Sequence, residues 1–211
     1  MNESKYLLII SLLLFFSVHT EIATGEVAVS LSTHSPDGWP NAGSNHGWEF
    51  TVNEEITLTH LGLYDHGDNG FSIDHPIGLW RLSDEALLAS GTVSAGTGDT
   101  LIDHFRYIDV PDVDLSIDVD YVVGFYTDTD EMDKAIIQAN DLQVNSAINL
   151  IVGRYDGAGQ FQMPANEIVE NPPDPYYPDR FGPNFQFIPE PATISLLALG
   201  GLLLRKRRSR S

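Results

Sequence analysis

The sequence predicts an all-β protein, a two-layer antiparallel β-sandwich. Apolar and aromatic runs of strand length recur along the body of the chain, and turn-forming residues separate them. No amphipathic helical stretch of about a dozen residues competes with these runs. With 42% hydrophobic residues, the 211-residue chain has enough apolar side chains for a packed core. The ten expected strands cover residues 26–32, 47–52, 55–65, 75–82, 86–93, 101–110, 119–127, 134–139, 146–155 and 184–188.

The expected strand at 55–65 changes phase in its middle. Ile56 and Leu58 share one face of the strand, whereas Leu61 and Leu63 fall in the other phase. A β-bulge within the tripeptide at 60–62, which ends in a glycine, produces such a slip.

The next expected strands are defined by a turn and by their alternation. Ser83, Asp84 and Glu85 supply turn-forming side chains between strands 75–82 and 86–93, which predicts a hairpin. In the run YVVGFY, at 121–126, apolar residues occupy both phases of the alternation. This pattern predicts a central strand whose second face is partly covered by a loop or a neighbour.

Residues 164–183 contain six prolines, a composition that by itself favours an extended linker. Phe185 and Phe187 follow this stretch and alternate as in a buried strand. We therefore expect a long surface loop that returns to a closing strand; the alternative is a spacer that leads to the C-terminal segment.

The body of the chain is strongly acidic and the chain has no cysteine. Between residues 21 and 188 there are five cations and twenty-eight acids, a net charge of −23 within a total of −19. Such a body repels nucleic acid, so nucleic-acid binding is excluded. The lack of cysteine excludes disulfides, thiolate metal sites, thiol nucleophiles and a lipoprotein anchor.

Residues 1–25 have the pattern of a secretory signal peptide. Lys5 precedes the apolar run YLLIISLLLFFSV at 6–18, and small residues follow at Ala23 and Gly25. The run is shorter than the ~20 residues of a membrane span. We therefore expect a signal helix that is cleaved on export, with an uncleaved anchor as the alternative.

Residues 189–211 have the pattern of a second targeting segment, at the C-terminus. Three features follow one another there: the triplet Pro189-Glu190-Pro191, an apolar run of thirteen residues at 192–204, and a basic cluster that begins with Arg205, Lys206, Arg207 and Arg208. As a helix with ~1.5 Å per residue, the run covers about 20 Å of a hydrocarbon core of about 30 Å. By the positive-inside rule, the basic cluster stays in the cytoplasm and the acidic body lies outside.

The order of these features resembles the PEP-CTERM sorting signal of exported bacterial proteins. The resemblance implies export by the Sec machinery, transient anchoring in the inner membrane, and removal of the tail by an exosortase, a membrane-embedded transpeptidase-like enzyme. The protein then reaches the cell surface or the extracellular matrix, usually of a Gram-negative bacterium that makes exopolysaccharide. An ordinary tail anchor is the alternative.

Four strand-like motifs, GWEFTV, EITLTHLGLYD, HPIGLW and YVVGFY, make residues 45–187 similar to a bacterial β-sandwich domain of unknown function. The resemblance implies a jelly-roll-like module for the domain at 26–188, and it supplies no catalytic residues.

The sequence lacks four well-known catalytic signatures. The G-x-S-x-G elbow, the P-loop, G-x-G-x-x-G and H-E-x-x-H are all absent. The many acids single out no pair for glycoside hydrolysis. We therefore expect a non-enzymatic structural or binding module.

Two loops bring hard oxygen ligands together in the sequence and are candidates for a structural calcium site. The first holds Asp65, Asp68, Asn69 and Asp74, and the second, which we favour, holds Asp128, Asp130 and Asp133. Zinc bound by His60, His66 and His75 is an alternative, and ordinary acidic turns are the other explanation.

Aromatic side chains that are exposed can stack on sugar rings. Trp48 and Trp80 lie within expected strands, so we expect them in the core. Trp39, Tyr176 and Tyr177 lie in loops and are the candidates for ligand binding. The alternative function is therefore a carbohydrate-binding module for exopolysaccharide, with calcium as a bridge between anionic surfaces.

Overall fold

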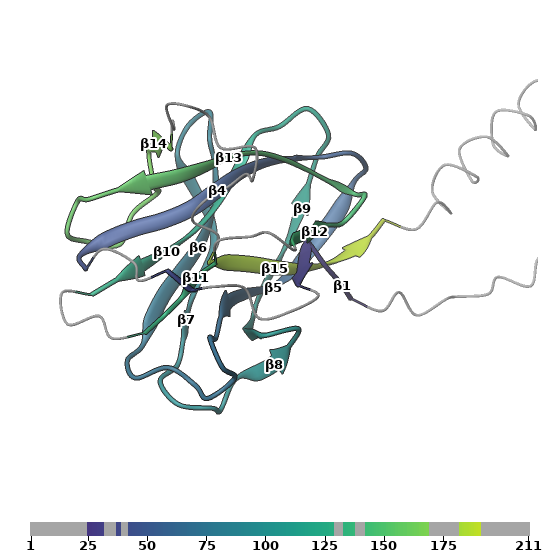
Figure 1. The fold of residues 1–211 in the computed structure, drawn as a ribbon. Coiled ribbons are helices and arrows are strands. Elements are labelled where there is room, and N and C mark those ends of the chain that lie inside the picture. The colour runs from purple at the N-terminus through teal and green to yellow at the C-terminus, as the bar shows by residue number, and fades with distance from the viewer. Residues whose placement is uncertain are drawn as a thin grey trace, which may run out of the picture.

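The protein is all-β and antiparallel in the part of the chain that the structure describes. The computed structural model describes residues 25–31, 37–38, 42–128, 133–137, 142–168 and 182–190. Within them there is no helix, and every pairing between strands is antiparallel (Figure 1). The all-β prediction is confirmed at this level. The expected signal helix and C-terminal helix lie outside the described residues.

Two large sheets and two small ribbons make up the fold. The five-stranded sheet has the order β1 (Glu26–Val27), β15 (Pro183–Pro189), β5 (Ile56–Tyr64), β9 (Phe105–Leu115) and β8 (Thr100–Ile102). The six-stranded sheet has the order β14 (Asn166–Glu167), β13 (Ile148–Asp156), β4 (Ser44–Val52), β10 (Tyr121–Thr127), β6 (His75–Arg81) and β7 (Ala86–Val93). The ribbons pair β2 (Val29–Leu31) with β12 (Leu142–Val144), and β3 (Asp37–Gly38) with β11 (Ile136–Ile137).

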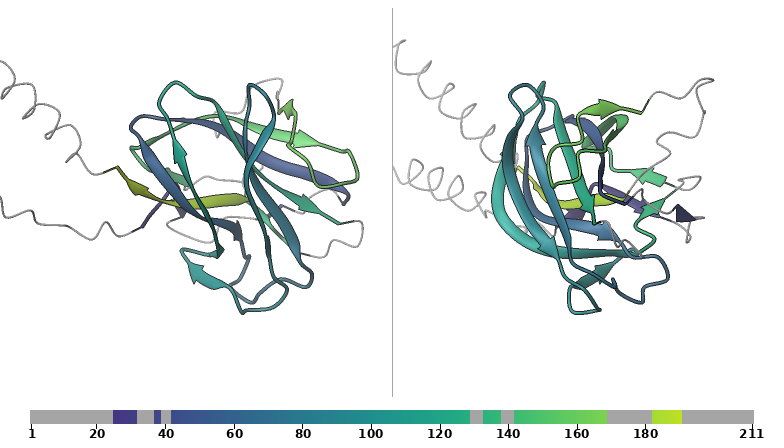
Figure 2. Two further views of the ribbon diagram at one scale, coloured as in Figure 1. Left: turned by 180° about the vertical axis from the view of Figure 1, so that it is seen from behind. Right: turned by 90° about the vertical axis from the view of Figure 1, so that its left-hand side faces the viewer.

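The hydrophobic core lies between the two large sheets, which Figure 2 shows from behind and from the side. Phe185 on β15 stacks against Trp48 and Phe50 on β4, with ring centroids 5.8 and 4.9 Å apart. All three rings are fully buried, as sequence analysis predicted for Trp48. Because each large buried apolar side chain contributes about 1.5–3 kcal/mol, these rings are a main source of adhesion between the sheets.

The strand expected after the proline-rich stretch is β15, and it lies inside the five-stranded sheet between β1 and β5. Its Asn184 explains why the expected strand 26–32 is two strands. The Asn184 side chain accepts from the Val29 N–H (3.2 Å) and donates to the Val29 carbonyl (2.8 Å). Val29 is thereby detached from the β1–β15 ladder, and the chain continues as β2 beside β12.

The phase slip expected in β5 is present, but it lies one residue earlier than predicted. The register shifts between Leu58 and His60 against both neighbouring strands, β9 and β15. Thr59 therefore has no register partner in either strand. Gly62 has a different role, because a Cβ there would lie 2.5 Å from the ring of Tyr107. The glycine therefore serves close packing.

The expected strand 101–110 is a hairpin. β8 ends at Ile102 and β9 begins at Phe105, and the two residues between them, Asp103 and His104, have φ values of 48° and 70°. Two positive φ angles define a type I′ turn, which Asn-Gly or Asp-Gly usually forms. The sequence lacks that glycine, so the turn escaped prediction.

β10 is a central strand between β4 and β6, as expected. Val122 on its outer face packs with Trp80 and Met163 in a second apolar cluster. The segment around Met163 crosses this face and is held by Asn45, whose amide donates to the Gln160 carbonyl at 2.8 Å. The predicted cover over the second face is therefore confirmed.

Candidate functional site

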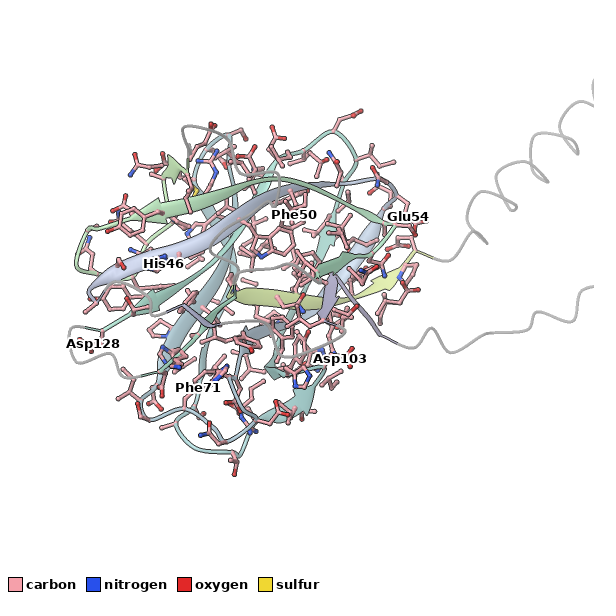
Figure 3. All side chains as sticks on the ribbon, viewed as in Figure 1. His46, Phe50, Glu54, Phe71, Asp103 and Asp128 are labelled. Carbon is pink, nitrogen blue, oxygen red and sulfur yellow. The ribbon has the colours of Figure 1, made fainter. Side chains whose placement is uncertain are left out.

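The two acidic loops proposed for calcium meet at one end of the molecule. The Asp133 carboxylate accepts from the Ser72 N–H at 2.9 and 2.8 Å, and its Oδ2 lies 3.1 Å from His75 Nε2. Figure 3 shows this end, where Phe71 marks the first loop and Asp128 the start of the second. The two loops, 61 residues apart in sequence, are thus joined by one carboxylate.

Asp65 is committed to a buried ion pair. Its Oδ2 accepts from Arg106 Nε at 2.7 Å, and both side chains are nearly inaccessible. Arg106 also donates to the Thr97, Asp99 and Asp68 carbonyls at 3.1–3.2 Å. Removing one partner of such a buried pair costs about 3–5 kcal/mol, so Arg106 firmly holds two loop segments, the one with Asp65 and Asp68 and the one with Thr97 and Asp99.

The remaining acids of the first loop point to separate partners. Asp68 contacts His104 Nδ1 at 2.9 Å, and Asp74 accepts from the Ala95 N–H at 2.8 Å. Within the described residues, no group of three or more His, Asp or Glu side chains is placed to hold a metal ion. Asp130 lies outside those residues, so calcium at the second loop stays a prediction.

The three histidines considered for zinc also have separate contacts. His60 Nδ1 lies 2.9 Å from Thr59 Oγ1, and His66 Nδ1 lies 3.4 Å from Tyr64 Oη. His75 is fully buried beside Asp133. The described part of the chain does not bring these imidazoles into one group.

A buried polar cluster at the start of β4 was missed by sequence analysis. Ser44 Oγ lies 2.7 Å from His46 Nε2, and Thr127 Oγ1 donates to the Ser44 carbonyl at 3.0 Å. The His46 ring packs 5.9 Å from Phe125 and 5.1 Å from Tyr155. A serine beside a histidine is the arrangement of a nucleophile and its base. Here both side chains are buried, and the pair is a polar contact inside the core.

The i, i+2 spacing of Ser44 and His46 was the available signal for this cluster. It continues in phase into Trp48 and Phe50, which marks all four side chains as facing inward.

Of the five aromatic residues considered for sugar binding, Trp48 and Trp80 are buried and the other three lie outside the described residues. Trp80 is 4% exposed and packs 5.3 Å from the Phe161 ring, so its predicted core position is confirmed. Trp39, Tyr176 and Tyr177 lie outside the described residues. Their role in sugar binding stays a prediction.

Two tyrosines that lie near acidic side chains have raised pKa values. Burial raises the pKa of Tyr107 well above its ordinary value, and Asp103 adds to the effect. The Tyr64 pKa is also raised, first by burial and then by Asp68 and Asp65. Burial is thus the main cause of both shifts, and the neighbouring aspartates add to it.

The triplet Pro189-Glu190-Pro191, which the sequence predicts to be a sorting signal, begins inside the fold. Pro189 is the last residue of β15 and lies opposite Ile56, and the Glu190 N–H donates to the Glu55 carbonyl at 3.1 Å. Pro191 and the cluster Arg205, Lys206, Arg207 and Arg208 lie outside the described residues. No helix among the described residues is long and apolar enough to span a membrane.

The first and last described strands are neighbours. Glu26 in β1 pairs with Phe187 in β15, so the described chain begins and ends on adjacent strands at one edge (Figure 1).

These features define a protein class only at the level of the fold, an all-β antiparallel domain. No known protein family matches the chain, and no curated protein shows a significant match to it.

Proposed function

We propose that this chain is an exported bacterial protein that an exosortase processes at its C-terminus and that then resides on the cell surface or in the extracellular matrix. Its domain, in our proposal a jelly-roll-like β-sandwich, has a structural or binding role and no catalytic one.

The observation that carries the proposal is where the fold ends. β15 stops at Pro189, the first residue of the triplet, and Glu190 adds one further backbone bond to the sheet. Every described strand therefore survives removal of the residues after Glu190. A tag can be cut off without loss of the domain if it contributes no strand to it, and no described strand includes a residue after Glu190.

The pairing of β1 with β15 supports the same proposal. Because these strands are adjacent, an N-terminal signal peptide and a C-terminal anchor would both attach at one edge of the domain. A chain held in this way faces the membrane through a single edge while it waits for processing.

Charge favours release after the tail is removed. The basic cluster supplies five of the eleven cations, and a body with a net charge of −23 remains. Such a body is repelled by anionic lipid headgroups.

Mass spectrometry of the protein from the cell surface tests the proposal. We expect a mature C-terminus near Pro189–Pro191 in cells with an exosortase and an intact tail in matched cells without it. A variant with Pro189, Glu190 and Pro191 changed to alanine is the control and should keep its tail. A surface protein that still carries the basic cluster would contradict the proposal.

A further inference from the structure

Pro189, the first residue of the triplet, belongs to the five-stranded sheet, and Glu190 is joined to the sheet by a backbone hydrogen bond. Pro189 lies opposite Ile56, and the Glu190 N–H donates to the Glu55 carbonyl oxygen. We propose that this docking restrains the triplet, so that Pro189 and Glu190 must detach from β5 before a processing enzyme binds them. The inference rests on the proposed function, because it concerns how often the same signal is accessible.

Only the end of β15 can detach while the domain stays folded. Phe185 and Phe187 are fully buried between the sheets, and β1 pairs with β15 as far as Phe187. Beyond that point, β5 is the only described strand that pairs with β15. Pro189 is half-buried and Glu190 is exposed. Opening of this end therefore costs much less free energy than global unfolding.

Thr57 on β5 holds the Glu190 side chain, and Asp114 competes for the same hydroxyl. Thr57 Oγ1 lies 3.2 Å from Glu190 Oε1 and 3.0 Å from Asp114 Oδ1. A hydroxyl has one proton, so it can donate to only one of these carboxylates at a time. The two negative charges that converge on one oxygen atom also repel each other. The Glu190 contact is thus strong enough to favour docking and weak enough to open.

Docking and recognition by an enzyme are mutually exclusive. A segment that is paired with β5 along one edge cannot at the same time be enclosed on both edges by the cleft of another protein. The apparent affinity of the enzyme for the signal is then lowered by the fraction of chains that are undocked. Loss of one side-chain hydrogen bond raises that fraction by about fivefold.

Three variants of the full-length chain test this restraint. Thr57→Val removes the hydroxyl and keeps the shape of the side chain, and Asp114→Asn removes the competing charge. Thr51→Val is the matched control, because Thr51 lies on β4 in the other sheet, where its Oγ1 accepts from Asn149 at 3.2 Å. Pulse-chase labelling in cells with an exosortase gives the rate of tail removal. Hydrogen exchange of the Glu190 amide in the purified full-length chain measures docking directly.

We expect Thr57→Val to be processed about fivefold faster than wild type, with faster exchange at Glu190. Asp114→Asn should slow both processes, and Thr51→Val should change neither. Faster exchange in Thr57→Val without faster processing would overturn the inference, and so would an unchanged exchange rate. A wild-type chain that is never processed would instead overturn the proposed function, whatever the exchange data show.

Discussion

Tyr107 is the residue whose ionisation is most directly coupled to folding. Its hydroxyl accepts from Asn184 Nδ2 at 2.7 Å, and burial raises its pKa well above the ordinary value. Between about pH 10 and the folded-state pKa, the unfolded chain loses this proton and the folded chain keeps it. The unfolded state then binds fewer protons, so the free energy of unfolding falls as pH rises, by at most about 1.4 kcal/mol per pH unit for this group.

We therefore expect Tyr107→Phe to lose stability less steeply than wild type above pH 10. At neutral pH the variant should be less stable by about 1–3 kcal/mol, because the buried Asn184 amide loses an acceptor. Urea unfolding at several pH values between 8 and 11 measures both effects. Tyr64→Phe is a second probe, since burial and two aspartates also raise the Tyr64 pKa. An alkaline slope as steep as that of wild type in both variants would contradict this account.

At the scale of elements, two glycines let a segment cross the six-stranded sheet. Gly47 on β4 and Gly124 on β10 are paired, and Pro164 of the crossing segment lies over both. A Cβ at Gly47 would lie 2.1 Å from the Val123 carbonyl oxygen, and one at Gly124 would lie 2.9 Å from the Pro164 ring. Bare backbone at these two positions is what allows the close approach.

Gly47→Ala should lower the free energy of unfolding by at least about 1–3 kcal/mol, because the added methyl group meets backbone atoms that cannot move aside. Gly98→Ala is the matched control, since a Cβ there would have no neighbour within 4 Å. The control should stay within about 0.5 kcal/mol of wild type. Denaturant unfolding of both variants measures the difference, and equal stabilities would show that Gly47 does not approach the β10 backbone as described.

The strands that sequence analysis located well are those with clear alternation or a defining turn. β7 covers the expected residues 86–93, and its hairpin with β6 is fastened by Arg81, whose Nε donates to Asp84 at 2.9 Å. The strands that escaped are short: β12 has three residues and β14 has two, which is too few for a periodic pattern. Their positions follow from tertiary pairing.

The contacts made by the acidic side chains could not be predicted from the sequence for a related reason. The predicted clusters contain acids that are neighbours in the chain, but the contacts that these acids make are long-range. Asp65 pairs with Arg106, 41 residues away, and Asp133 binds the backbone of Ser72, 61 residues away. A single sequence does not reveal such partners. Ser44 and His46, by contrast, alternate in phase with the buried Trp48 and Phe50, so their spacing indicates that they face inward, although the expected strand began only at residue 47.

At the scale of the whole molecule, the arginines of the described fold are all paired with acids. Arg81 pairs with Asp84, Arg106 with Asp65, and Arg154 with Glu49. Those pairs use three of the twenty-eight acids of the body, which far outnumber its five cations. Repulsion among the other carboxylates therefore opposes the compact state.

We expect sodium chloride to raise the melting temperature, because screening weakens this repulsion more than it weakens the buried ion pairs. Between about 20 mM and 500 mM salt, a gain on the order of 1 kcal/mol corresponds to about 2–4 °C for a chain of this size. Calorimetry with calcium chloride at matched ionic strength separates screening from specific binding, since a bound ion adds stability that depends on its own concentration. A further rise with calcium would support the predicted site at Asp128, Asp130 and Asp133. A melting temperature that falls as sodium chloride is added would instead show that attractive pairs dominate the electrostatics of the fold.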